Sequence, residues 1–120
     1  MELNKLYFYT ATILNWKQLL RFDTYKDYII NSLKYLVDEK KIALYGFVIM
    51  PNHIHLIWEL LELNGKELPH SSFMKYTSHL ILKDLQMNNP ELLKEFKVDL
   101  ETRNYQFWQR DALPIHLYTP

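Results

Sequence analysis

A two-residue turn signal, Pro51-Asn52, joins two apolar segments and constrains the fold more than any other feature of the sequence. The first segment, IALYGFVIM (42–50), is apolar at both parities, and the second is HIHLIWEL (53–60). Proline fixes φ at the first corner of a tight turn, and asparagine tolerates left-handed φ at the second. The sequence therefore predicts an antiparallel hairpin. Because segment 42–50 is apolar on both sides, either both of its faces are covered or one lines a functional floor.

The remaining segments complete a single α+β domain over residues 1–120. β-Branched and aromatic runs predict strands, and apolar residues at helical spacing predict helices. In chain order we expect a strand at 6–13, a helix at 24–38, the two hairpin strands, a helix at 73–88, a short helix near 90–97 and a strand at 104–110. Ser71 or Ser72 is expected to cap the second long helix. Residues 111–120 contain two prolines and are expected to be irregular.

This order of elements is the split βαβ, or ferredoxin-like, pattern. It predicts an antiparallel sheet with its helices packed on one face. No internal repeat or linker interrupts the chain. The fold class alone does not define a function, because the same architecture carries many different sites.

Two histidines, His53 and His55, begin the second strand of the hairpin. Residues i and i+2 of a strand share a face roughly 6–7 Å apart, so the two imidazoles can converge on one divalent ion. The alternate residues from Ile54 onward take the opposite face. Glu59 shares the parity of the histidines but lies on the order of 13 Å beyond His55, too far for a ligand. Two solvated polar residues, or an incidental pH-sensitive pair, are the alternatives that spacing leaves open.

Composition excludes several kinds of site. The chain has no cysteine, which excludes disulfides, thiolate metal sites and a cysteine nucleophile, and an intracellular setting fits best. The 14 basic and 14 acidic residues balance to zero, so nucleic-acid binding requires a local patch. The N-terminus lacks the features of a signal peptide, and the apolar runs are too short to cross a bilayer. We expect no membrane partner.

Two segments offer candidate DNA-binding residues. They are Lys75, His79 and Lys83 in the second long helix, and Arg103, Trp108, Gln109 and Arg110 near the expected last strand. The helical residues recur every four positions and would line one stripe, which is either a track for phosphates or an ordinary solvated face. In the second group, aromatics can stack on bases while arginines hold phosphates. Its alternative is that Phe107 or Trp108 fills the core. His70 and His116 are expected to be loop residues with no special role.

The stretch GFVIMPNHIHLIWEL (46–60) resembles the core of the single-tyrosine transposases of the HUH superfamily, where His-hydrophobic-His follows a Met-Pro-Asn turn. It is particularly similar to the branch that includes the REP-associated tyrosine transposases and related small insertion-sequence enzymes. The resemblance extends to YFYTATILNW (7–16), SSFMKYTSHL (71–80) and FWQRDALPIHLY (107–118). It therefore covers nearly the whole chain in the same order.

The resemblance implies a ferredoxin-like nuclease domain that acts on single-stranded or hairpin DNA. His53 and His55 would bind Mg²⁺ or Mn²⁺, which polarises the scissile phosphate. A tyrosine hydroxyl would attack and leave a 5′-phosphotyrosine. In the family this tyrosine lies on a helix after the last strand, so we expect it beyond Pro120 and expect the chain to be truncated before it. Neither Tyr105 nor Tyr118 is expected to replace it.

The resemblance also implies a cytoplasmic protein, associated with the nucleoid when bound to DNA, and homodimers are common in the family. Three functions remain in competition at this point. The first is a metal-dependent transposase or single-strand endonuclease domain. The second is a catalytically inactive descendant that only binds single-stranded nucleic acid, and the third is an unrelated ferredoxin-like metal hydrolase.

Overall fold

The computed structural model of the chain describes residues 1–110 and 112–117. Its elements in chain order are β1 (Leu6–Thr12), η1 (Leu14–Trp16), η2 (Leu19–Arg21), α1 (Asp23–Asp38), β2 (Ile42–Met50), β3 (His53–Leu60), α2 (Pro69–Asn88), α3 (Pro90–Leu93), η3 (Lys94–Phe96), β4 (Lys97–Leu100), β5 (Arg103–Tyr105) and β6 (Leu113–His116). The three η elements are short 3-10 turns. No helix in the described ranges is long and apolar enough to span a membrane.

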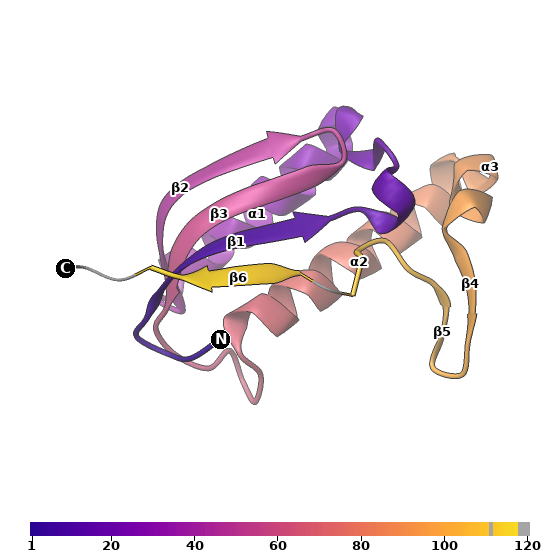
Figure 1. Cartoon of the computed structure of the whole chain (residues 1–120). Coiled ribbons are helices and arrows are strands. Elements are labelled where there is room, and N and C mark those ends of the chain that lie inside the picture. Colours follow the sequence, from indigo (N-terminus) through magenta and orange to yellow (C-terminus); the bar gives the residue numbers. More distant parts are fainter. Residues whose placement is uncertain (111, 118–120) are drawn as a thin grey trace.

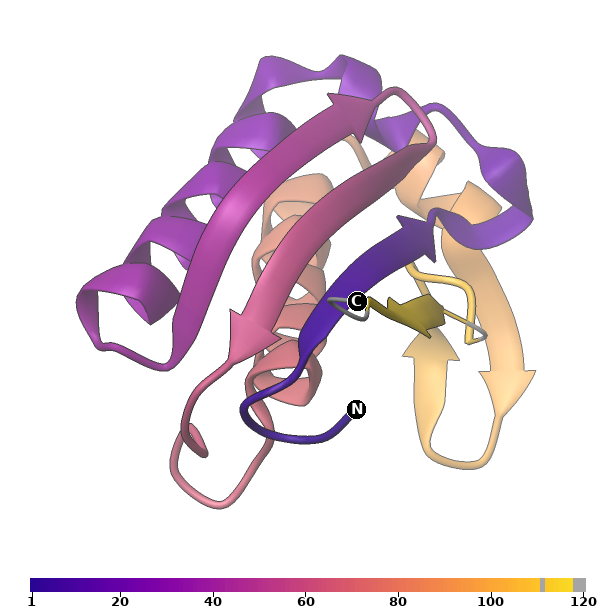
Figure 2. The same cartoon turned by 60° about the vertical axis from the view of Figure 1, so that its left-hand side comes forward.

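Four strands form the main sheet in the order β2-β3-β1-β6, and every neighbouring pair is antiparallel. The connection from β1 through α1 to β2 leaves room for β3 between the two strands, which is the split βαβ arrangement. Helices α1 and α2 both lie behind this sheet and leave its other face open (Figures 1 and 2). The ferredoxin-like α+β fold predicted from the order of elements is confirmed.

The hairpin between β2 and β3 has a two-residue turn as predicted, because Met50 pairs directly with His53 across Pro51 and Asn52. Asn52 does not have the left-handed φ that the sequence suggested for the second corner. Along β3, buried and half-buried residues alternate without interruption. The residues from Ile54 through Trp58 that face the helices are completely buried. Burial of each such side chain contributes about 1.5–3 kcal/mol relative to exposure. This burial fixes the register, since a slip of one residue would turn the whole apolar set toward solvent.

The last strand of the sheet is not where the sequence suggested. Residues 104–110 were expected to form it, but Arg103–Tyr105 instead pairs with β4 in a separate two-stranded sheet. The fourth strand of the main sheet is β6, inside the stretch expected to be irregular. Pro114 is compatible with this position because β6 pairs only with β1 and lies at the edge, where a missing N–H removes no ladder bond.

Helix α2 begins earlier than predicted. Its first residue is Pro69, preceded by Leu68 as the N-cap, and neither Ser71 nor Ser72 caps it. Proline suits this first position because its fixed φ is helical and its absent N–H would have no partner there. The Ser72 hydroxyl instead donates to the Pro69 carbonyl over 3.0 Å. The earlier start places His70 on the helix, so the expectation of a loop residue is wrong there, as it is for His116, which lies in β6.

Candidate functional site

His53 and His55 lie side by side on the open face of the sheet, away from the helices. Their ring centroids are 4.7 Å apart, with the ring planes at 74°. Across β1, Thr12 is the partner of His53 and Thr10 is the partner of His55. The pair thus occupies the middle of the sheet, flanked on both sides by strands, at the end nearest the turn.

Both imidazole rings are oriented by a hydrogen bond at Nδ1. The Asn52 side-chain oxygen lies 2.7 Å from Nδ1 of His53, and since a carbonyl oxygen only accepts, Nδ1 must carry the proton. The Thr10 hydroxyl lies 2.9 Å from Nδ1 of His55. With Nδ1 engaged, Nε2 is the ring nitrogen left for another partner. A metal-binding histidine is commonly held in this way through its second nitrogen.

The environment of His55 favours the neutral form of its ring. The ring stacks on Phe8 with centroids 5.1 Å apart. Burial, together with the nearby charge of His53, lowers the pKa of His55 below its ordinary value of 6.5. A neutral imidazole is the form that binds a metal ion. His55 is therefore ready to act as a ligand at neutral pH.

The pair fits part of a divalent metal site. Imidazole nitrogens suit Mn²⁺ and can supplement the oxygen ligands that Mg²⁺ prefers. Within residues 1–110 and 112–117, no cluster of three or more His, Cys, Asp or Glu side chains could hold an ion. Glu59 is therefore not a third ligand, as its distance along the strand indicated. Two histidines leave further positions for water, phosphate or side chains from elsewhere.

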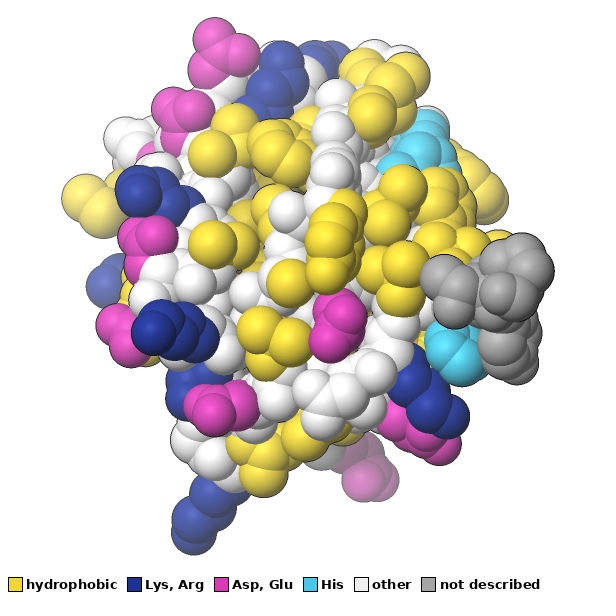
Figure 3. Space-filling view, turned by 90° about the vertical axis from the view of Figure 1, so that its left-hand side faces the viewer, with side chains coloured by type: hydrophobic (Ala, Val, Ile, Leu, Met, Phe, Trp, Pro, Cys, Tyr) yellow, Lys and Arg dark blue, Asp and Glu magenta, His cyan; other side chains and the backbone are white. Residues whose placement is uncertain are grey.

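Apolar side chains surround the pair on the open face. Val48 and Met50, the β2 partners of His55 and His53, are both substantially exposed, as are Leu113 and Ile115 on β6. Figure 3 shows hydrophobic side chains spread over this side of the molecule, with few charged ones among them. Of the two alternatives for segment 42–50, covered faces or an open apolar floor, the structure has the open floor.

A second feature, a cleft of about 630 Å³, lies between α2 and the segment from β5 to β6. Its walls contain every candidate DNA-binding residue except Lys83: Lys75, His79, Arg103, Trp108, Gln109 and Arg110. Sequence positions 75–79 and 103–110 are thus brought together by the fold. Lys83 lies one turn farther along α2 and is exposed. The cleft is the local patch that a chain of zero net charge needs for binding a polyanion.

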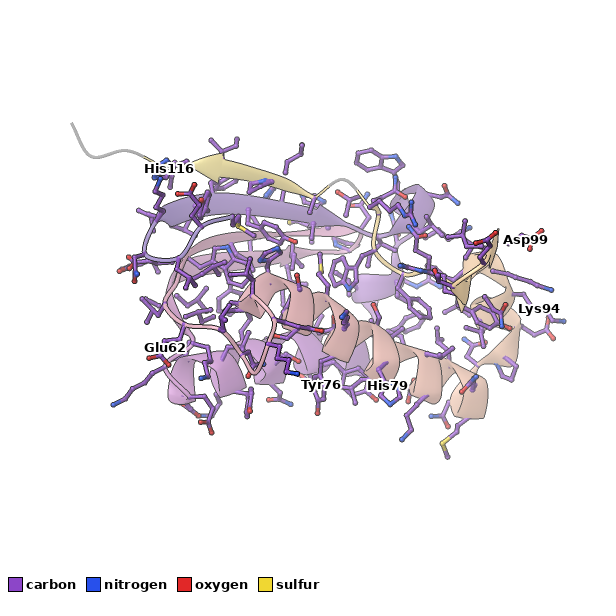
Figure 4. The ribbon with its side chains drawn as sticks, turned by 90° about the horizontal axis from the view of Figure 1, so that it is seen from below. Glu62, Tyr76, His79, Lys94, Asp99 and His116 are labelled. Atoms are coloured by element: carbon purple, nitrogen blue, oxygen red, sulfur yellow. The ribbon has the colours of Figure 1, made fainter. Side chains whose placement is uncertain are left out.

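Three basic side chains, Lys75, Arg103 and Arg110, line the cleft. His79, Arg103 and Arg110 are exposed, and none of the described residues that line the cleft is acidic. Lys75 pairs with Glu67, which lies outside the lining. In Figure 4 the helices lie below the sheet, and His79 lies on the side of α2 away from it. The histidine pair and the cleft therefore lie on different sides of the sheet.

Trp108 and Gln109 do not present their side chains as free contacts. Trp108 is buried, and its indole N–H donates to the Thr77 hydroxyl over 3.1 Å. The alternative that Trp108 fills the core thus describes its position. Gln109 donates its backbone N–H to the Thr12 carbonyl, and its side-chain oxygen accepts from the Asn15 N–H over 3.2 Å. Gln109 joins the end of β1 to the loop that follows.

Sequence reasoning missed His70 as a wall residue of this cleft. Its ring lies edge-on to Tyr9 with centroids 6.4 Å apart, and its Nδ1 is buried without a hydrogen-bond partner. Burial lowers the pKa of His70. The signal was the Leu68-Pro69 pair, because a proline after an extended residue often opens a helix. Reading that start would have placed His70 on the same helix as Lys75 and His79.

Two of the described tyrosines, Tyr9 and Tyr25, are unsuited to act as a nucleophile. Burial raises the pKa of Tyr9, and burial with a hydrogen bond to Asp84 raises the pKa of Tyr25, so both phenols stay protonated. The Tyr25 hydroxyl donates to Asp84 over 2.7 Å. Tyr105 is half-buried in the wall of the cleft. Tyr118 and Pro120 lie outside the described residues.

These features define a class of protein: an antiparallel ferredoxin-like domain with a His-x-His pair on the open face of its sheet. Its fold is similar to that of a solved REP-associated tyrosine transposase whose structure is bound to a REP hairpin, with a TM-score of 0.60 and 15% sequence identity. The match covers 99% of this chain and 59% of that chain. At this identity the likeness establishes the fold. No known family model matches the sequence, and no curated protein does.

Proposed function

We propose that this chain is the metal-binding and DNA-binding part of a single-tyrosine transposase or single-strand endonuclease. The observation that carries the proposal is the orientation of His53 and His55, whose rings are held at Nδ1 and share one open face. The fold likeness and the resemblance of the sequence around Pro51-Asn52 support the same function. The cationic cleft supports DNA as the partner.

In this proposal His53 and His55 hold Mg²⁺ or Mn²⁺ through Nε2. The bound ion would withdraw charge from the scissile phosphate as a Lewis acid. Asn52 and Thr10 fix the two rings, so that little reorganisation is needed when DNA arrives. The nucleophilic tyrosine comes from outside the described residues, and its ester with the 5′-phosphate conserves the bond energy for later strand joining.

The cleft beside α2 is proposed to hold the sugar-phosphate backbone of a DNA hairpin. Arg103 and Arg110 are exposed there and can each bind a phosphate in bidentate fashion. Lys75, which also pairs with Glu67, and the ring of His79 extend the same wall along the helix. Because the cleft lies on the helix side of the sheet, it would position the hairpin while a single-stranded flank reaches the histidines on the open face.

A second candidate function is binding of single-stranded nucleic acid without cleavage. One observation favours it: among the described residues no third acidic, cysteine or histidine side chain completes a cluster with the pair. In that case the pair would be a remnant, and only the cleft would matter for function. The two candidates differ in their dependence on the histidines.

The test uses the complete reading frame, a labelled hairpin oligonucleotide with single-stranded flanks, and Mg²⁺ or Mn²⁺. We expect metal-dependent nicking and a covalent protein–DNA adduct on a denaturing gel. His53→Ala and His55→Ala should abolish both, whereas His116→Ala, a matched histidine on β6, should not. Binding by wild type and His53→Ala alike, with no adduct from either protein, supports the second candidate. A protein that binds no hairpin at all contradicts both.

A further inference from the structure

The loop after β1 contains two consecutive residues in left-handed backbone conformation, Asn15 at φ 55° and Trp16 at φ 59°. Asparagine adopts this conformation readily, but a bulky residue with a Cβ does so at a cost. Trp16 is also 66% exposed, so burial of its ring does not offset that cost. A strained, exposed tryptophan is unusual and calls for a reason outside the folding of the domain.

The strained loop is tightly held rather than free. The Trp16 N–H donates to the Ile13 carbonyl over 2.9 Å, and the Leu14 N–H donates to the Phe107 carbonyl over 2.8 Å. The Gln109 side-chain oxygen accepts from Asn15 at the first left-handed position. The partners in these contacts are Ile13, early in the sequence, and Phe107 and Gln109, late in the sequence. They hold the backbone of Trp16 in place before any ligand arrives, which lowers the entropic cost of binding.

The loop lies at the same end of the sheet as the histidine pair. Thr12, the last residue of β1, is the cross-strand partner of His53. The next residue, Ile13, donates its N–H to the Asn52 carbonyl over 2.9 Å, and Asn52 also holds the His53 ring. Trp16 is thus linked to His53 through two backbone hydrogen bonds and one side-chain hydrogen bond.

Trp16 borders a hollow of about 440 Å³ whose other walls include Lys17, Gln18 and Arg21. Lys17 pairs with Glu95 over 3.3 Å, so these two charges offset each other and Arg21 is the remaining cation of the hollow. An aromatic face beside a cation and an amide is the combination that binds an unpaired nucleotide, with the base stacked and the phosphate near a positive charge. The hollow is separate from the cleft beside α2, which shares none of these residues.

We propose that Trp16 is a stacking platform for an unpaired nucleobase in the single strand that runs to the histidine pair. This inference rests on the proposed function, because it assigns part of the DNA that the site would bind. It goes further by naming a ligand class, an unpaired base, and a position next to the phosphate. The loop holds Trp16 by its backbone hydrogen bond at a place where the ring is exposed and a base can reach it.

The experiment exploits the contrast among the tryptophans. All three lie in the described part of the chain, and Trp58 and Trp108 are buried while Trp16 is exposed. Iodide should therefore quench Trp16 selectively. A hairpin with a single-stranded flank, added to the 120-residue chain without metal, should protect Trp16 from iodide. A blunt hairpin without the flank should not.

Trp16→Asn removes the ring but keeps a residue that tolerates the left-handed backbone. It should weaken binding of the flanked hairpin by roughly 5- to 150-fold, the range of one lost base–aromatic stack. It should leave binding of the blunt hairpin within about 2-fold, and the melting temperature should be equal to or above that of the wild type. Tyr35→Ala, at a matched exposed aromatic on α1, should change neither.

The inference is wrong if Trp16→Asn binds the flanked hairpin as tightly as the wild type does. If the melting temperature of this variant is also lowered, Trp16 is a structural residue. Failure of the proposed catalysis can be distinguished from failure of the stacking role. If the wild type binds the flanked hairpin but forms no adduct, the chemistry assigned to the histidines is wrong while the stacking role stands on the binding data. If iodide protection requires a protein partner instead of DNA, the surface is a protein interface and the inference is wrong.

Discussion

The carboxamide oxygen of Asn52 accepts a hydrogen bond from Nδ1 of His53 over 2.7 Å. Asn52 is also a corner residue of the β2–β3 turn, and its backbone carbonyl accepts from Ile13. One residue therefore closes the hairpin, anchors the loop after β1 and fixes the protonated nitrogen of the neighbouring histidine. The tight turn and the candidate metal ligand are parts of a single local structure.

Asn52→Ala should lower the affinity of the site for Mn²⁺ by about 10- to 100-fold, the usual effect of removing a group that orients a metal ligand. The cause is loss of the fixed tautomer, since Nδ1 and Nε2 of His53 can then exchange the proton. Titration calorimetry, or paramagnetic broadening of the histidine signals by Mn²⁺, measures the change. Asn88→Ala, an exposed asparagine at the end of α2, is the control. Equal affinity in Asn52→Ala and wild type would show that the hydrogen bond does not tune the ligand.

The stability of the domain should fall in acid because of two histidines. The pKa values of His55 and His70 are lowered in the folded chain, mainly by burial. Between the pKa of a histidine in the unfolded chain, about 6.5, and its lower pKa in the folded chain, the unfolded chain binds more protons. The free energy of unfolding therefore decreases as the pH falls through this window. Urea unfolding at pH 7.5 and pH 5 measures the difference. His70→Gln should reduce the difference in the free energy of unfolding between the two pH values. If this variant keeps the full difference, burial of His70 does not cause it.

The hairpin and its histidines could be predicted because they depend on local chemistry. Pro51 and Asn52 specify the turn, and the alternation in β3 specifies which side chains face the helices. Given that parity, His53 and His55 had to share the open face. The order of elements then limited the topology, since strand connections of this kind are right-handed and short.

The C-terminal third was harder to predict because its structure depends on long-range pairing. Pro114 argued against a strand, yet the edge of the sheet beside β1 accepts it. The aromatic run at 104–108 has strand composition, but burial of Trp108 against Thr77 takes priority over pairing with the main sheet. Neither the edge position nor the Thr77 hydroxyl can be recognised from the segment itself.

The Trp108–Thr77 contact should stabilise the fold without contributing to DNA binding. The Thr77 hydroxyl accepts from the Trp108 indole and donates to the Phe73 carbonyl over 2.8 Å. Thr77→Val would leave the buried indole N–H without a partner, at a cost of about 1–3 kcal/mol in the free energy of unfolding. Trp108→Phe in that background should cost less than in the wild type, which a double-mutant cycle of urea melts measures. Hairpin affinity that falls with Trp108→Phe, in a protein that is still folded at the assay temperature, would place the ring in the DNA interface instead.

Removal of a positive charge from the cleft should change how the affinity for a hairpin depends on salt concentration. Arg103→Ala and Arg110→Ala each remove an exposed cation from the wall opposite α2. Lys34→Ala removes an exposed cation, paired with Asp38, from α1 outside the cleft. Each lost phosphate contact should lower the steepness of log K against log salt concentration by about 0.7 for single-stranded DNA and about 0.9 for a duplex stem. Fluorescence anisotropy between low and moderate salt measures this slope. We expect a shallower slope and weaker binding for both arginine variants, with Lys34→Ala like the wild type.

If all three variants behave alike, binding is general electrostatic attraction and the cleft has no special role. If only the arginine variants change, and the change is larger for a hairpin than for an unstructured strand of the same length, the stem of the hairpin lies in the cleft.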